Sequence, residues 1–267
     1  MTHYSAEIGI VGGSGFYEFA EGSIKEIKIE TPYGSPSDKI ALMTVAGKSV
    51  AFLPRHGKSH SLPPHKVPYK ANLWALKSLG VSRVLAPSAV GSLQPHIAPG
   101  DFVINDQFID RTSGRADTYY DGPIVTHISS AEVYCPQLRD LAIESSKQHQ
   151  INVHETGTSV VIQGPRFSSK AESRWFTQMG WDTVTMTQYP EMVLARELAL
   201  CYVTISLVTD YDAGIVFESA AVQTHDVLAM VARNTANVKN VLKSMLAQMP
   251  AERACDCADS LRYARME

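Results

Sequence analysis

The chain has no long hydrophobic run, no excess of charge of one sign and no secretory signal. No window of its 267 residues approaches the roughly 18 consecutive apolar positions of a membrane-spanning helix. Its 24 lysines and arginines against 27 aspartates and glutamates give a net charge of −3, which provides no basic field for nucleic acid. Because residues 1–7 lack a charged region followed by an apolar one, we predict a cytoplasmic protein that binds neither membrane nor nucleic acid.

Cysteine is also scarce, with four residues in the whole chain. Cys255 and Cys257 form a C-x-C pair in a C-terminal tail of about residues 250–267, and Cys135 and Cys201 lie far from them in sequence. Two ligands make a poor zinc site, so we predict no metal site. A disulfide in the tail and ordinary surface thiols both remain open. Pairing of Cys135 with Cys201 and of Cys255 with Cys257 is one of three connectivities.

What the chain does contain is an alternation of apolar, β-branched runs with helical patterns. Its 45% hydrophobic and 19% charged residues are ordinary for a globular enzyme. No repeat or flexible linker divides it, so we predict a single α/β domain over residues 1–267, with a mixed sheet flanked by helices. The predicted strands cover residues 7–11, 40–45, 49–53, 83–89, 101–106, 157–163, 182–186 and 198–209. The predicted helices cover residues 69–79, 136–148, 169–179, 190–198 and 223–249.

Two aspartates follow the most apolar of these runs. Residues 198–208 are typical of a buried strand, and Asp210 and Asp212 come directly after them, two positions apart. Ligands bind outside the carboxyl ends of strands in open α/β sheets. If burial and the neighbouring acid keep one carboxyl protonated, the pair offers a donor beside an acceptor. That arrangement complements N7 and the 6-amino group of adenine. A tight loop with solvated acids is the alternative.

Other strand ends carry groups suited to an anion. Residues 12–16 place Ser14 among glycines whose amides can approach an anion, although neither common nucleotide fingerprint is present. Arg55 and His56 end a second apolar run, and residues 86–92 end a third with two serines. A structural glycine turn and a surface Arg-His pair are the alternatives. Three such ends without a basic patch fit one small phosphate better than a polyanion.

Two apolar side chains lie beside polar ones at further strand ends. Phe167 follows residues 163–166, and Met186 directly precedes Thr187. Phe167 is suited to stacking on a base, but a single phenylalanine is more often part of the core. Met186 is suited to an apolar floor under a ligand, but methionine too is more often core filler. Thr187 adds a hydroxyl close to the predicted helix 190–198.

Together these segments resemble the family of trimeric purine nucleoside phosphorylases, in its methylthioadenosine phosphorylase branch. The matches run from residue 8 to about residue 245 in the family's order, and they include residues 12–16, 31–37, 55–57, 69–76, 91–93, 106–112, 163–168, 186–187, 190–191 and 209–212. The resemblance implies an α/β domain with a central mixed, partly barrel-like β-sheet flanked by helices. It implies a homotrimer, or a dimer of trimers. It also implies reversible phosphorolysis of a purine nucleoside, with inorganic phosphate as co-substrate and no metal or organic cofactor.

The same resemblance implies a role for each matching position. The residues implied in phosphate binding are Ser14, Arg55, His56, Ser88, Ala89 and Thr187. Phe167 and Met186 are implied at the base and ribose. Asp210 and Asp212 are implied at the purine edge, with Asp210 as the catalytic acid. Ser168 and Thr224 fall where the family tunes specificity, and His127 resembles a residue that a neighbouring subunit lends to the 5′ end of the nucleoside.

Two positions bear on the choice of substrate. Where the 6-oxopurine branch has Asn, this chain has Asp210, so it resembles members selective for 6-aminopurines. At position 224 this chain has Thr224, followed by His225, where the mammalian-like methylthioadenosine enzymes of the family have a smaller apolar 5′ pocket. Thr224 or His225 is able to hydrogen-bond a 5′-hydroxyl. Three functions therefore stay open: phosphorolysis of methylthioadenosine, phosphorolysis of a broader set that includes adenosine, inosine or guanosine, and purine binding without catalysis. Base release that requires phosphate separates the enzymes from the binding protein.

Overall fold

The central strands are those buried on both faces. The computed structural model describes residues 4–13, 22–215 and 224–266, and in it every residue of β1 (Ile8–Gly12) is buried. β4 (Lys48–Pro54) and β5 (Arg83–Ser92) flank β1, and β11 (Cys201–Tyr211) runs parallel to β5 along its whole length. Continuous apolar runs are typical of strands that are covered on both sides. These four strands form the buried centre of the sheet.

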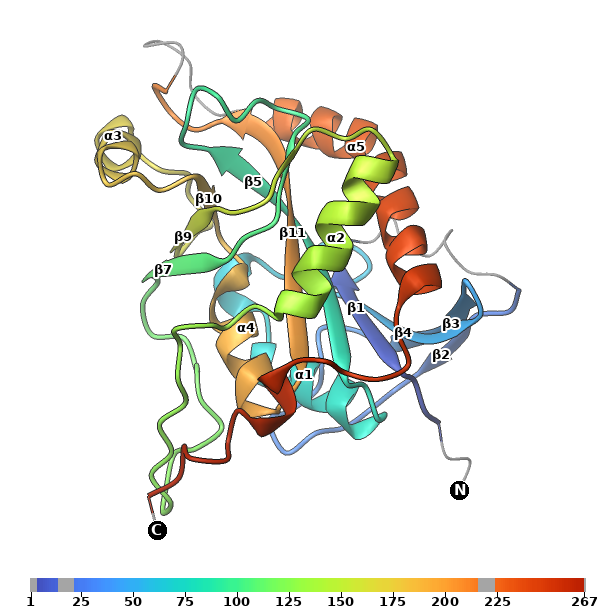
Figure 1. Ribbon diagram of the computed structural model, residues 1–267. Coiled ribbons are helices and arrows are strands. Elements are labelled where there is room, and N and C mark those ends of the chain that lie inside the picture. The colour runs from blue at the N-terminus through green and yellow to red at the C-terminus, as the bar shows by residue number, and fades with distance from the viewer. Residues whose placement is uncertain (1–3, 14–21, 216–223, 267) are drawn as a thin grey trace.

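Eleven strands of the described residues form one mixed sheet (Figure 1). The others are β2 (Lys25–Ile27), β3 (Ile40–Val45), β6 (Phe102–Val103), β7 (Gln107–Arg111), β8 (Val153–His154), β9 (Thr158–Ile162) and β10 (Thr183–Thr185). The order is β2-β3-β4-β1-β5-β10-β9-β7, and β5 also pairs with β11, which continues to β6 and β8. At β5 the sheet therefore branches, because one arm continues through β10 to β7 and the other through β11 to β8. A flat open sheet has no such branch. The predicted mixed sheet is confirmed.

Helices cover both faces of this sheet. α2 (Pro136–Gln148) and α5 (Thr224–Gln248) pack against each other and against β11, and Figure 1 shows them side by side to the right of that strand. α1 (Tyr69–Ser78) and α4 (Gln188–Glu197) contribute to a second apolar cluster. Alternate residues of β11 enter the two clusters, so the clusters lie on opposite faces. α3 (Lys170–Gln178) follows β9, and two short 3-10 helices are η2 (Pro64–Lys66) and η3 (Asp256–Asp259).

Local signals in the sequence set the helix boundaries. Pro136 occupies the first position of α2, where its missing N–H costs nothing. Ser169 caps α3: its hydroxyl accepts from the Glu172 amide at 3.2 Å, and the Glu172 carboxylate accepts from the Ser169 amide at 2.7 Å. In the part of α5 whose side chains the structure describes, Val238, Val241, Leu242 and Met245 recur at spacings of three and four and are almost fully buried.

Some boundaries differ from those predicted. β6 is shorter than the predicted strand 101–106; beyond it the Ile104 amide donates to the His154 carbonyl at 2.9 Å, and the buried Asn105 side chain donates to the Gly157 carbonyl at 2.9 Å. β11 begins three residues later than predicted, because residues 198–200 complete the last turn of α4, with Ala199 at φ 54°. β2, β7 and β8 were not predicted, since most of their residues are exposed or half-buried and form no apolar run.

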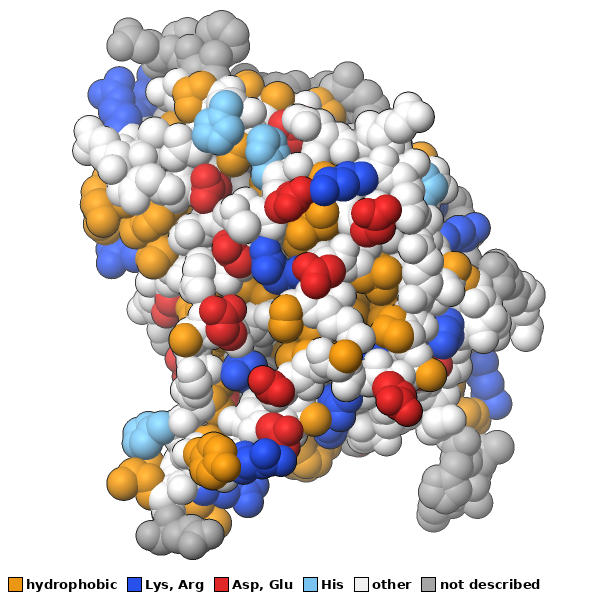
Figure 2. All heavy atoms as spheres, viewed as in Figure 1, with side chains coloured by type: hydrophobic (Ala, Val, Ile, Leu, Met, Phe, Trp, Pro, Cys, Tyr) orange, Lys and Arg blue, Asp and Glu red, His pale blue; other side chains and the backbone are white. Residues whose placement is uncertain are grey.

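The surface carries charges of both signs. Asp and Glu side chains are interspersed with Lys and Arg on the face shown in Figure 2. That face therefore has no extended basic field of the kind that binds nucleic acid. Among the described helices, none combines the length and the apolar character needed to cross a membrane.

The four cysteines lie together although they are distant in sequence. All are free thiols, and Cys135, Cys201 and Cys257 are buried. The Cys255 sulfur lies 3.4 Å from the Cys201 sulfur and 3.6 Å from the Cys135 sulfur. The structure thus differs from the two separate pairs considered from the sequence, and the alternative of surface thiols in the tail is wrong for Cys257, which is buried.

Candidate active site

Strand ends and loops from several parts of the chain enclose a cavity of about 460 Å³. A volume of this size suits a small-molecule ligand. Ten of the residues predicted for the site line it: Arg55, His56, Ser88, Ala89, Phe167, Ser168, Met186, Thr187, Asp210 and Asp212. Ser14 lies outside the described residues, and Thr224 begins α5 with its side chain outside them. The fold therefore brings the groups predicted for phosphate and those predicted for purine to one place.

The guanidinium of Arg55 is held by Glu191. Arg55 Nε and Nη2 each lie 2.8 Å from a Glu191 carboxylate oxygen, and Nη2 and Nη1 also donate to the carbonyls of Val11 and Pro87 at 3.0 and 3.3 Å. Both charged side chains are buried. Burial lowers the pKa of Arg55, but the Glu191 carboxylate outweighs burial, so the pKa lies above its usual value. Four of the five N–H donors are used, which leaves one Nη1 donor for a ligand.

His56 is held as a neutral ring. Its Nδ1 lies 2.8 Å from the Leu62 carbonyl oxygen, which can only accept, so Nδ1 carries the proton. Burial and the charge of Arg55 lower the pKa of His56 to about 4. Nε2 of the neutral ring is then an acceptor. His56 can donate to phosphate only if Nε2 also carries a proton. In the neutral ring, Nε2 instead accepts a hydrogen bond from a protonated phosphate oxygen.

We expect phosphate binding to weaken as the pH rises. Neutral His56 accepts a hydrogen bond from a protonated phosphate oxygen but repels an unprotonated one, so KM for phosphate should rise severalfold between about pH 6 and about pH 8. His56→Gln supplies an amide donor at every pH and should flatten this dependence. Steady-state kinetics of the two proteins with phosphate varied measure the effect. Equal slopes against pH would remove His56 from the phosphate site.

Three buried hydroxyls meet beside Arg55 and His56. Ser88 Oγ lies 3.2 Å from Thr187 Oγ1 and 3.5 Å from Thr185 Oγ1, and all three residues line the cavity. Hydroxyls that contact mainly one another keep donors available for a ligand oxygen. We call Arg55, His56, Ser88, Thr185 and Thr187 the oxyanion cradle. Thr185 was missed from the sequence, although it lies two positions before Thr187 at the end of the same strand.

β11 carries the two aspartates into the cavity by way of a bulge. Its pairing with β5 skips one residue between Val208 and Asp210, so Thr209 is the extra residue. A bulge shifts the alternation of side chains along a strand. Leu207 and Thr209 before the shift, and Asp210 and Asp212 after it, therefore all line the cavity.

The two aspartates both approach Gly91, and Asp212 is buried while Asp210 is half-buried. A Cβ added to Gly91 would lie 3.5 Å from Asp210 Oδ2 and 3.6 Å from Asp212 Cβ. Asp210 Oδ1 accepts from the Thr209 hydroxyl at 2.6 Å, and Asp212 accepts from the Ser173 hydroxyl. Burial, with the charge of Asp212, raises the pKa of Asp210 to about 6, and burial also raises the pKa of Asp212. The alternative of a loop with solvated acids is wrong, since Asp212 is 4% exposed.

Apolar side chains complete the wall of the cavity. Phe167 is 39% exposed and lines the cavity, so the alternative that it fills the core is wrong. Met186 packs against Gly164, where an added Cβ would lie 2.7 Å from its sulfur. Val184 and Val238 line the same cavity. Such surfaces suit the faces of a base and the apolar part of a nucleoside.

Two further residues bear on the site but do not line the cavity. Glu191, which received no role from the sequence, is fully buried behind Arg55 and also accepts from the Tyr202 hydroxyl at 2.8 Å. A carboxylate in the first turn of α4, directly before the apolar run Met192–Ala195, was the available signal. His127 is exposed, with its amide donating to Ala264 at 2.7 Å, and does not line the cavity of its own chain.

Comparison with known proteins identifies the family, because residues 7–247 match the model of the phosphorylase superfamily. The chain belongs to this superfamily. The S-methyl-5′-thioadenosine phosphorylase of Thermofilum pendens is 51% identical over 96% of this chain and 97% of that protein. The purine nucleoside phosphorylase of Streptomyces coelicolor is 48% identical over 96% and 94%. The crystal structure of a methylthioadenosine phosphorylase from an Antarctic soil metagenomic library has a TM-score of 0.92 at 42% identity, covering 98% of this chain and 93% of that one.

In this member of the phosphorylase superfamily, the cavity is lined by the Arg55 guanidinium, by hydroxyls and by the carboxyl groups of Asp210 and Asp212. In the part of the chain that the structure describes, the one group of three or more converging His, Cys, Asp or Glu ligands is the set of four cysteines. None of the four lines the cavity.

Proposed function

We propose that this protein catalyses the reversible phosphorolysis of S-methyl-5′-thioadenosine to adenine and 5-methylthioribose 1-phosphate. The observation that carries the proposal is the presence of the oxyanion cradle and of the Asp210–Asp212 pair in the walls of one cavity. Phosphate attack on a purine nucleoside needs an anion site beside a site for the purine edge. The 51% identity with a relative of that name, over nearly the whole of both chains, supports the substrate.

The cradle acts on the sugar side of the reaction. As the bond from C1′ to the base lengthens, positive charge grows on the ribose. Phosphate held by Arg55 and by the hydroxyls of Ser88 and Thr187 stabilises that charge and is positioned to attack C1′. Glu191 fixes the Arg55 guanidinium before phosphate arrives, so little reorganisation is needed during the reaction.

The aspartates act on the leaving base. Negative charge grows on the departing adenine, which needs a proton or a strong hydrogen bond at N7. Asp210, whose pKa burial and Asp212 raise to about 6, retains a proton much closer to neutral pH than an ordinary aspartate does. In its ionised form Asp212 accepts from the 6-amino group. The bond to N7 strengthens as charge develops, so Asp210 stabilises the transition state more than the bound substrate.

A broader purine nucleoside phosphorylase is the second candidate. The Streptomyces coelicolor relative of that name is 48% identical. Thr224 and His225 are polar where a methylthio group favours an apolar pocket, so they support binding of a 5′-hydroxyl. Purine binding without catalysis is the most distant alternative, because it leaves the buried hydroxyls and guanidinium of the cradle without a use.

We further propose that the protein is a homotrimer in which His127 reaches the nucleoside of a neighbouring subunit. His127 is exposed, and Ile124 and Val125 on the same segment are 52% and 50% exposed. Neighbouring exposed apolar side chains often mark protein interfaces. An interface over this segment leaves His127 available to a second chain.

The substrate proposal is tested with methylthioadenosine, adenosine and inosine, each with and without phosphate. We expect base release only with phosphate, and kcat/KM in the order methylthioadenosine, adenosine, inosine, because the acid pair complements a 6-amino group. Chromatography of the free bases measures it. Equal kcat/KM values for adenosine and methylthioadenosine would assign the broader activity. Release without phosphate indicates a hydrolase, and no release from any nucleoside indicates a binding protein.

A further inference from the structure

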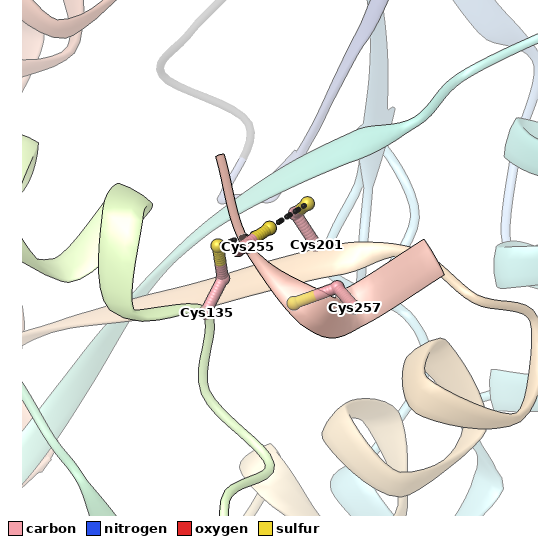
Figure 3. Close-up of side chains that lie close together, drawn as sticks. All are labelled: Cys135, Cys201, Cys255 and Cys257. Carbon is pink, nitrogen blue, oxygen red and sulfur yellow. Dashed lines mark hydrogen bonds between the residues drawn. The ribbon is translucent and has the colours of Figure 1, made fainter. Parts of the chain in front are cut away.

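Four cysteine sulfurs converge where three segments of the chain meet (Figure 3). Cys135 directly precedes α2, Cys201 begins β11, Cys255 directly precedes η3 and Cys257 lies within it. The four sulfur atoms all lie within 4.8 Å of one another. Because the segments are far apart in sequence, their meeting is a product of the fold.

The sulfur separations suit four ligands around one ion. Cys255 Sγ lies 3.4 Å from Cys201 Sγ and 3.6 Å from Cys135 Sγ. With a zinc–sulfur bond of about 2.3 Å, two sulfurs of a tetrahedral site lie about 3.8 Å apart. Cys255 is therefore nearly equidistant from two partners and is not paired with one. The remaining sulfur separations are also no longer than 4.8 Å.

The surroundings also fit such a site. Cys135 and Cys201 are 0% exposed and Cys257 is 5% exposed, and they border the apolar cluster beneath α2 and α5. Cys255 is half-buried, which leaves a path for an ion to enter. Arg253, two residues before Cys255, donates at 3.1 Å to the backbone carbonyl two residues before Cys201. Its positive charge offsets part of the negative charge of four thiolates.

We propose that Cys135, Cys201, Cys255 and Cys257 form a structural site for a thiophilic divalent cation, with zinc the best match. Soft thiolates in a tetrahedral arrangement select zinc or iron over hard cations such as magnesium. Four protein ligands leave no open coordination position, so the site is structural rather than catalytic. The ion ties the C-terminal tail to the starts of α2 and β11.

This site is distant from the cavity along β11. Nine residue steps of roughly 3.3 Å separate Cys201 from Asp210, which places them roughly 30 Å apart. Loss of the ion therefore releases the tail and lowers stability, while the groups around the substrate stay in place. Stability and turnover separate this inference from the proposed function, since either can fail without the other.

Metal analysis of the whole chain tests the proposal. Protein purified without oxygen in the presence of a reductant, loaded with Zn²⁺ and freed of excess ion, should hold one zinc per chain by elemental mass spectrometry. Co²⁺ in place of Zn²⁺ should give the strong visible absorption of a tetrahedral thiolate complex. A chelator that removes the ion should lower the melting temperature and leave kcat unchanged.

Cys257→Ser removes one ligand and should abolish the cobalt absorption and the zinc content. Asp256→Asn is the matched control, because it changes the exposed residue between two of the cysteines and keeps all four sulfurs. The cobalt spectrum of the unmutated protein decides the matter even if the serine variant does not fold. Iron found in place of zinc supports the site and changes only the ion. Failure of the fully reduced, unmutated protein to bind either ion overturns the proposal.

Discussion

Replacing Asp210 with alanine should lower kcat by roughly 10²- to 10⁴-fold, the usual contribution of a positioned acid, while KM for the nucleoside changes far less. The physical reason is that the hydrogen bond to N7 strengthens as charge develops on the leaving base. Phosphate-dependent release of adenine from methylthioadenosine, followed at saturating phosphate, measures both parameters. A variant within a few-fold of the wild type would exclude Asp210 as the acid.

The pH profile and a second variant sharpen this result. Burial and Asp212 raise the pKa of Asp210 to about 6, so its protonated fraction falls as the pH rises through about 6. Wild-type kcat/KM should fall on that alkaline side, and Asp210→Ala should lack this limb. Asp210→Asn keeps one donor and one acceptor but cannot ionise, so it should move preference toward inosine. An unchanged ratio of inosine to adenosine turnover contradicts the role of Asp210 at the purine edge.

The second large effect is expected at Glu191. Glu191→Ala leaves the Arg55 guanidinium charged, buried and without its carboxylate, which should cost about 3–5 kcal/mol of unfolding free energy. The same change frees Arg55 to reorient, so KM for phosphate should also rise. Denaturant unfolding and phosphate-dependent kinetics measure the two consequences separately. A loss of less than about 1 kcal/mol would show that the pair is not maintained in solution.

The chain contains a matched control for this prediction. Arg166 forks onto Glu172 with two contacts of 2.7 Å, but its side chain is 70% exposed. Arg166→Ala should therefore cost no more than about 1 kcal/mol, because water screens an exposed pair. A double variant, Arg55→Met with Glu191→Leu, should recover stability without recovering phosphate binding, since two apolar groups replace two buried charges.

Much of the site could be predicted from the sequence because its residues end apolar runs. Arg55, Ser88 and Asp210 each follow or close such a run, and the carboxyl ends of neighbouring parallel strands meet at one edge of a sheet. A local pattern was therefore enough to place these three side chains in one cavity. The helices at Pro136 and Ser169 were equally predictable, because their signals lie within one turn of chain.

The remaining features depend on contacts between distant parts of the chain. Glu191 meets Arg55 across 136 residues of sequence, and the state of the His56 ring depends on the Leu62 carbonyl that faces it. The cysteines were judged by their spacing, which suggested at most two separate pairs, whereas the fold gathers all four. Local periodicity carries no information about such encounters, since they arise only when the sheet and its two helical layers assemble.

The extra residue at Thr209 limits how far the motif itself can be trusted. On a strand that ran regularly through the same letters, Tyr211 would project its phenol inward and the acids would point the opposite way. Grafting the Asp-Tyr-Asp tripeptide onto a straight scaffold would therefore yield a different surface. A search for relatives by the Asp-Tyr-Asp motif alone would therefore collect proteins that share the sequence but not the arrangement of the side chains.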